Sequence, residues 1–180
     1  MDDIDQFASS LLNEAKRFLE RSREAQGGSA EAPNLHAALM LASCALEAHI
    51  NAVVDDFSNR PELSVHEKGV LTERDVHLED GAFILGSGLR IWRMEDRLSL
   101  LHQKFSKNGL DVTASWRSKL SNAMDLRNKL THPKIVPLVT TGAVEKAIEA
   151  VIETINELYL ALYNRSLPAA NLGLASTLDF

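Results

Sequence analysis

The spacing of apolar residues is the feature that most constrains how this chain folds. Apolar side chains recur at steps of three and four residues through most of the sequence, which is the period of an amphipathic α-helix. The clearest case is the segment 142–165, with Val144, Ile148, Val151, Ile155, Leu158 and Leu162 on one face. No segment of useful length alternates polar and apolar residues as a half-buried strand does. The sequence therefore predicts an all-α protein.

Five main helices are expected, joined by short connections. They cover residues 4–26, 33–57, 89–105, a segment that starts after Asp111 or Thr113 and runs to 132, and 142–165. Such helices pack as an antiparallel bundle of four to five main helices. A length of 180 residues suits one domain, so we expect a single domain over 1–165 and a C-terminal tail over 166–180. Residues 61–88 are expected to be an insertion or lid, with a short helix over 62–72 and a mobile, glycine-rich connection after it.

Composition excludes several classes of protein. Cys44 is the single cysteine, and no histidine or cysteine pair has the spacing of a zinc site, so we expect neither a disulfide nor a metal or other cofactor. The first residues are acidic and lack the basic and apolar regions of a secretory signal. No uninterrupted apolar run reaches the ~20 residues that cross a bilayer. We therefore expect a cytoplasmic protein without a membrane partner.

Charge is distributed unevenly along the chain. The net charge is −6, yet residues 88–135 hold ten basic and four acidic residues. Arg90, Arg93 and Arg97 recur at steps of three and four on the expected helix 89–105, with Lys104 one repeat further on. Such a stripe favours contact with a polyanion such as RNA. The alternative is a solvated face that Glu95 and Asp96 balance. Both tryptophans, Trp92 and Trp116, are expected in the core.

Two charged residues lie within or beside the apolar faces of their helices. Arg127 projects between Leu120 and Ala123 on the apolar side of its helix, where an unpaired charge is costly. On the helix 33–57, Ser43, Glu47 and Asn51 recur every four residues beside the apolar stripe. We expect Glu47 to pair with Arg127 and to fix its direction. The alternative is that both side chains reach solvent along the edge of the bundle.

His132 ends the same helix as Arg127 and precedes Pro133. The negative end of a helix dipole favours a protonated imidazole, which suits a general acid near neutral pH. Asn128 lies four residues before His132 and shares its face, whereas Arg127 lies ~140° away around a regular helix. Either the last turn unwinds, or a second copy of the chain completes the site. The alternative is a histidine that caps its helix and does nothing else.

The string Arg127-Asn128-Lys129-Leu130-Thr131-His132 resembles the motif of HEPN domains, which is an arginine, four to six residues of which the first is polar, and a histidine. The helix around Glu47 also resembles the earlier, acidic helix of that family, and the resemblance covers about residues 35–163. It implies a metal-independent endoribonuclease, often a toxin or defence protein, that acts as a homodimer. Arg127 would then hold the scissile phosphate, and His132 would move a proton. Asn128 would orient the histidine or the phosphate. Arg90, Arg93, Arg97, Lys129 and Lys134 would contact RNA, while Ser43, Glu47 and Asn51 would support the site.

Two other functions fit the same residues. One is a HEPN-like binding or scaffold module without catalysis, whose apolar tail docks on a partner such as an antitoxin or regulatory protein. The other is a regulator that binds a nucleotide at the same cleft without cutting RNA.

Overall fold

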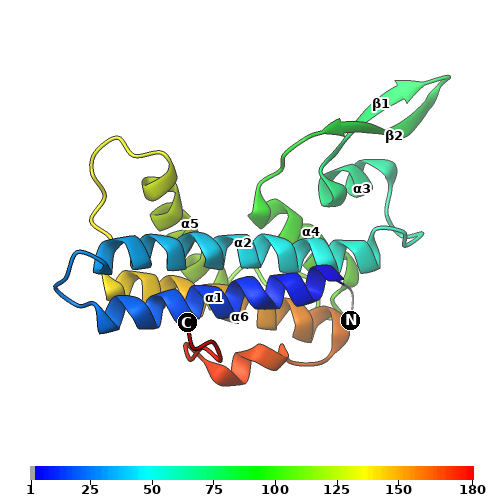
Figure 1. Cartoon of the computed structure of the whole chain (residues 1–180). Coiled ribbons are helices and arrows are strands. Elements are labelled where there is room, and N and C mark those ends of the chain that lie inside the picture. Colours follow the sequence, from blue (N-terminus) through cyan, green and yellow to red (C-terminus); the bar gives the residue numbers. More distant parts are fainter. Residues whose placement is uncertain (1–2) are drawn as a thin grey trace.

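The computed structural model describes residues 3–180 and shows a mostly helical fold, as predicted. Three long helices lie side by side (Figure 1). These are α1 (Asp3–Glu24), α2 (Glu31–Phe57) and α6 (Thr141–Tyr163). Two shorter helices, α4 (Met94–Phe105) and α5 (Ser115–Thr131), pack against them. The remaining elements are α3 (Val65–Thr72), strands β1 (Arg74–Glu79) and β2 (Ala82–Leu89), and a short 3₁₀ helix, Pro168–Leu172.

The core lies between the long helices. Leu19 of α1, Leu46 of α2 and Ile148 of α6 are fully buried, and each such side chain contributes about 1.5–3 kcal/mol on leaving water. Helix α2 is central, since α1, α3, α4, α5 and α6 all contact it. It is long and apolar enough to cross a membrane by length and composition, and 56% of that apolar window is buried inside the bundle. Its position at the centre of the core accounts for its apolar character.

A β-hairpin replaces the mobile connection predicted after residue 72. Strands β1 and β2 pair antiparallel, with Glu79 opposite Ala82. Asp80 and Gly81 form the turn, with φ of 49° and 81°, and this left-handed pair is typical of two-residue hairpins. The short helix α3 precedes the hairpin and begins with a capping box between Ser64 and Glu67. Residues 74–89 therefore form a pair of strands, and the prediction of a chain without strands is wrong here.

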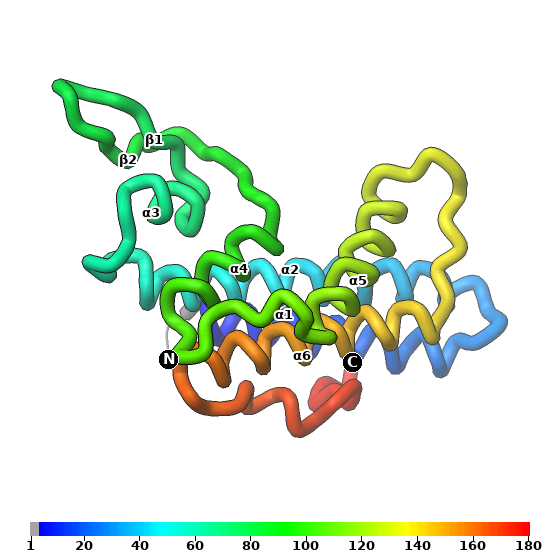
Figure 2. Tube along the Cα trace, turned by 180° about the vertical axis from the view of Figure 1, so that it is seen from behind, coloured from blue at the N-terminus to red at the C-terminus, as the bar shows by residue number. Residues whose placement is uncertain are grey.

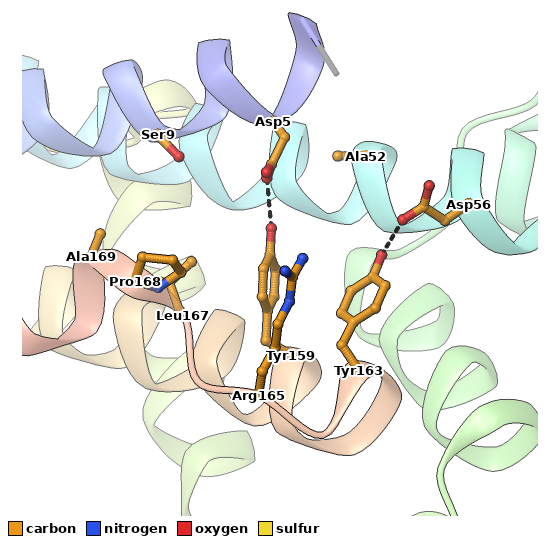
Figure 3. A pocket seen from close by; sticks show the side chains of 10 residues that line it. All are labelled: Asp5, Ser9, Ala52, Asp56, Tyr159, Tyr163, Arg165, Leu167, Pro168 and Ala169. Atoms are coloured by element: carbon orange, nitrogen blue, oxygen red, sulfur yellow. Dashed lines mark hydrogen bonds between the residues drawn. The ribbon is translucent and has the colours of Figure 1, made fainter. Parts of the chain in front are cut away.

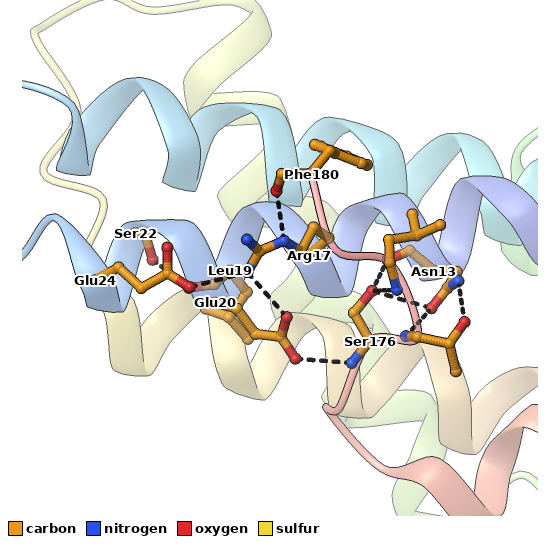
Figure 4. Close-up of polar contacts among 10 residues, drawn as sticks. Asn13, Arg17, Leu19, Glu20, Ser22, Glu24, Ser176 and Phe180 are labelled. Carbon is orange, nitrogen blue, oxygen red and sulfur yellow. Dashed lines mark hydrogen bonds and ion pairs between the residues drawn. The ribbon is translucent and has the colours of Figure 1, made fainter.

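The start of the third predicted helix also differs from the prediction. Helix α4 begins at Met94, so residues 90–93 form an extended connection and not the first turns of a helix. The tail 166–180 folds back along α1 (Figure 4). There the N–H of Thr177 donates to Asn13 Oδ1 at 3.0 Å, and Arg17 Nε donates to the carbonyl of Phe180 at 2.7 Å.

Two projections rise from the same side of the bundle (Figure 2). We call residues 74–91 the hairpin arm and residues 132–140, which join α5 to α6, the loop arm. Both expose large apolar side chains: Leu78, Phe83, Leu89 and Ile91 in the hairpin arm, and Ile135, Val136 and Leu138 in the loop arm. Val136 is 95% exposed. Exposed apolar groups gathered in this way are typical of interaction surfaces.

Candidate functional site

A pocket of about 400 Å³ lies between α2, α5 and residues 91–97, which lead into α4. Ser43, Cys44 and Glu47 of α2 form part of it. Helix α5 contributes Met124, Arg127 and Asn128. The connection into α4 contributes Trp92 and Arg93, and the first turn of α4 contributes Arg97. The fold thus brings together four residues that the sequence analysis placed in one site, namely Ser43, Glu47, Arg127 and Asn128.

Arg127 is half-buried on the wall of this pocket. Its Nη1 donates to Oδ1 of the neighbouring Asn128 at 3.1 Å. Within residues 3–180 it forms no ion pair at 4.0 Å or closer, so the predicted Glu47–Arg127 pair is absent, although both side chains line the pocket. Glu47 is exposed. A guanidinium without a carboxylate partner keeps N–H donors available for an anion.

Ser43 contributes little to the polar lining. Its side chain is 6% exposed, and its hydroxyl donates to the carbonyl of Leu39 at 3.0 Å, one turn earlier in α2. Such a bond satisfies the hydroxyl within its own helix.

His132 lies outside the pocket. It is the exposed C-terminal cap of α5, and its N–H donates to the carbonyl of Asn128 at 2.9 Å. The last turn of α5 is therefore regular, and it does not unwind to bring His132 beside Arg127. Asn128 lines the pocket and also lies one helical turn before His132. A single chain therefore places Arg127 and Asn128 in the pocket and leaves the His132 imidazole outside it.

Arg97 is a structural residue, and its predicted place on a solvated basic stripe is wrong. It is 2% exposed, and its Nε and Nη2 donate to the carbonyl of Leu71 at 3.2 and 2.9 Å. Nη2 also donates to Asn51 Oδ1 at 2.6 Å, and Nη1 lies 3.2 Å from the Glu73 carboxylate. Burial lowers the pKa of Arg97, while Glu73 and Glu47 oppose that shift. Asn51, predicted to support the candidate site, instead joins α2 to α4.

The other predicted RNA contacts remain exposed. The Arg90 guanidinium lies 4.7 Å from the centre of the Trp92 ring, and Arg93 pairs with Glu95 at 2.5 Å. Both arginines precede α4, so no single helix carries the predicted stripe. Lys129 and Lys134 have no carboxylate within 4.0 Å in the described part of the chain. Lys129 lies in the last turn of α5, and Lys134 lies in the loop arm.

Trp92 and Glu73 line the pocket and were not predicted to do so. Trp92 was expected in the core, but it is half-buried, and its buried indole Nε1 has no hydrogen-bond partner in residues 3–180. Trp116, by contrast, is 6% exposed and confirms the prediction of a core position. The run Arg90, Trp92 and Arg93 was a signal for the pocket wall, because an indole between two arginines suits contact with a nucleobase or an anion.

The formal charge of the pocket is nearly balanced. Two of its acids, Glu73 and Glu95, are paired with Arg97 and Arg93. Arg127 shares the pocket with Glu47 and Asp125 and has no ion-pair partner in residues 3–180. One chain offers a single open guanidinium, so binding of a polyanion needs further basic groups from the rim or from another copy.

Comparison with known proteins adds no family. No protein-family model, curated protein or solved structure matches this chain. The resemblance to HEPN domains stays a prediction that depends on the motif 127–132 and the helix order.

Proposed function

We propose that this chain is a metal-independent endoribonuclease of the HEPN type that cuts RNA in a cleft between two copies. The ribose 2′-oxygen attacks the adjacent phosphorus while the bond to the 5′-oxygen breaks, which yields a 2′,3′-cyclic phosphate and a free 5′-hydroxyl. His132 takes the 2′-hydroxyl proton or gives one to the leaving oxygen, and Arg127 binds the charged phosphate. General acid–base help supplies roughly 10²–10⁴-fold, and a preorganised charge supplies a comparable share.

The state of Arg127 supports this proposal most directly. Its guanidinium opens into a pocket, Asn128 holds it at 3.1 Å, and no carboxylate within residues 3–180 neutralises it at 4.0 Å or closer. A partly buried arginine that only stabilised the bundle would be paired, as Arg97 is with Glu73 at 3.2 Å. An open guanidinium on a fixed helix is suited to a phosphate oxygen.

The positions of His132 and the two arms support a second copy. Exposed His132 lies at the base of the loop arm, outside the pocket of its own chain. The loop arm, residues 132–140, holds one basic residue and no acid, whereas the hairpin arm, residues 74–91, holds three acids and two basic residues. In a two-fold dimer, the loop arm of each copy contacts the hairpin arm of the other, which gives two equivalent contacts. In each contact the two arms have opposite net charge, and both present apolar side chains. Such docking carries His132 toward the partner's pocket.

A binding module without catalysis is the second candidate. The balanced charge of the pocket, with Glu47 and Asp125 beside Arg127, favours it, because two carboxylates repel an RNA backbone. In that case the arms dock a different protein, and Arg127 and His132 have no chemical role.

A complementation experiment separates the candidates. Arg127→Ala and His132→Ala chains are each assayed on RNA with EDTA present, alone and after mixing and subunit exchange. Each variant alone is expected to be inactive. If Arg127 of one copy acts with His132 of the other, the mixture regains about one quarter of wild-type activity, since half the dimers are mixed and each has one intact site.

Arg21→Ala and His36→Ala serve as matched controls, because Arg21 lies in the last turn of α1 and neither residue lines the pocket. Both controls are expected to cut RNA at the wild-type rate. Intact RNA with the wild-type protein, or cleavage by both single variants, rules out the catalytic proposal. Activity that is lost in each variant and not regained on mixing places both residues in one chain.

A further inference from the structure

A second cavity, of about 530 Å³, lies between α1, α2, α6 and the start of the tail (Figure 3). It shares no lining residue with the candidate nuclease pocket. Its volume falls within the range of sites for small molecules, and the proposed RNA cleavage makes no use of it.

Two tyrosines form one wall and are held in place by carboxylates. Tyr159 donates its hydroxyl to Asp5 Oδ1 at 2.6 Å, and Tyr163 donates to Asp56 Oδ2 at 2.5 Å (Figure 3). Burial and these carboxylates raise the pKa of both hydroxyls, so both remain protonated donors at physiological pH. Each carboxylate keeps its second oxygen without a hydrogen-bond partner among residues 3–180.

Arg165 lies against both rings. Its guanidinium carbon is 5.3 Å from the centre of the Tyr163 ring and 6.0 Å from that of Tyr159. Cation–π attraction of this kind orients a guanidinium without using its N–H groups. The structure records no hydrogen bond or ion pair for Arg165 with residues 3–180.

The chain around Arg165 is fixed on both sides. Asn164 ends α6 in a left-handed conformation, with φ of 55°. Two residues after Arg165, the N–H of Leu167 donates to Asn156 Oδ1 at 3.0 Å, and Leu167 is 2% exposed. The unpaired guanidinium is therefore presented by a well-anchored turn.

We propose that this cavity binds a small zwitterion of the α-amino-acid type. The ligand carboxylate would accept hydrogen bonds from Arg165, and its ammonium would donate to the unpartnered oxygens of Asp5 and Asp56. Ala52, Leu167 and Pro168 supply an apolar wall for its side chain. A simple anion would meet two carboxylates, and a simple cation would meet Arg165, so the combination of charges selects a ligand that carries both signs.

Calorimetric titration with three probes that share the isobutyl group of leucine tests the charge requirement. The probes are L-leucine, 3-methylbutylamine, which lacks the carboxylate, and 4-methylpentanoate, which lacks the ammonium. Loss of one charge-assisted contact weakens binding by about tenfold or more, so L-leucine is expected to bind at least that much tighter than either relative. If the amine or the acid binds as tightly as L-leucine, or if none of the three binds, the proposal is wrong.

Arg165→Gln is expected to weaken L-leucine binding about tenfold or more and to leave binding of the amine unchanged or stronger. Arg60→Gln is the matched control, because the Arg60 guanidinium also lies over a ring, 5.5 Å from the centre of Phe57, but outside the cavity. Equal loss in both variants, or none in Arg165→Gln, contradicts the assignment. Far-ultraviolet circular dichroism of both variants checks that the fold is retained.

Discussion

Arg97 and Asn51 form a short hydrogen bond between α4 and α2, with Arg97 Nη2 donating to Asn51 Oδ1 at 2.6 Å. The arginine is 2% exposed and also bonds the carbonyl of Leu71. Its guanidinium therefore joins α2, α4 and the end of α3. The sequence suggested that Arg97 belongs to an RNA-binding stripe, but in the structure this residue links helices.

This link predicts a loss of stability on substitution. Asn51→Ala removes one acceptor of a buried charge and is expected to lower the free energy of unfolding by about 1–3 kcal/mol. Arg97→Ala, which also leaves Glu73 without its partner, should cost about 3–5 kcal/mol. Exposed Arg90→Ala is the control and should change stability by less than about 0.5 kcal/mol. Urea unfolding measures all three, and equal stability of the Arg97 and Arg90 variants contradicts the assignment.

The helices were predictable from the sequence because each buries one face. The expected segments 33–57 and 142–165 correspond closely to α2 (Glu31–Phe57) and α6 (Thr141–Tyr163). The hairpin was not predicted, because no residue of β1 is buried in the core and no alternation of polarity marks the strand. The turn pair Asp80-Gly81 was the one local signal for it.

The candidate site was predictable in part. The periodicity placed Glu47, Arg127 and Asn128 beside the core on two different helices. These helices are neighbours in the fold, so the three residues line one pocket. The pairing of Arg97 could not be predicted, since Glu73 and the carbonyl of Leu71 reach it through a chain reversal absent from the expected fold. The wall formed by Trp92 depends on the same reversal.

His49 is expected to make stability depend on pH. It is fully buried in α2, faces Asp5 of α1 and Tyr159 of α6, each at 3.5 Å, and burial lowers its pKa from 6.5 to about 4. Between these values the unfolded chain binds a proton that the folded chain does not. The free energy of unfolding therefore has its full value from His49 above pH 6.5. It falls as the pH is lowered toward 4, by about 3 kcal/mol at most.

Chemical unfolding at pH 7 and pH 4.5 measures this effect. His49→Phe keeps an aromatic ring beside Tyr159 and removes the proton, so its stability should fall less between the two pH values. His66→Phe is the control, because His66 is exposed and its ring packs at a tilt of 59° against Phe83 in the hairpin arm. A pH dependence that is the same in His49→Phe and in the wild type excludes His49 as its source.

The two arms are expected to control self-association. Val136→Asp places a charge on a side chain that is 95% exposed, so the stability of the monomer should change by less than about 0.5 kcal/mol. If the loop arm docks on the hairpin arm of a second copy, the same substitution should weaken the dimer about tenfold or more. Sedimentation equilibrium measures the dissociation constant.

Charge reversal tests which arms meet. Lys134→Glu and Glu79→Lys should each weaken the dimer about two- to fivefold, because each turns an attraction between arms into a repulsion. The double variant exchanges the signs on both arms and should recover the wild-type constant. Additive weakening in the double variant, or a wild-type chain that stays monomeric, contradicts the proposed dimer.

Lys16 is expected to lower the stability of the fold. Its side chain on α1 is 1% exposed, and Nζ has one hydrogen-bond partner in residues 3–180, the carbonyl of Ala169 at 3.4 Å. Burial lowers its pKa below 10.5, so the unfolded chain binds the proton more tightly, and stability should rise as the pH increases toward 10.5.

Lys16→Met removes the charge from a buried site and should raise the free energy of unfolding at pH 7 by about 1–3 kcal/mol. Lys107→Met, at an exposed lysine, should leave it within about 0.5 kcal/mol. If the Lys16 variant is less stable than the wild type at pH 7, the ammonium group stabilises the contact between α1 and the tail, and the expected sign is wrong.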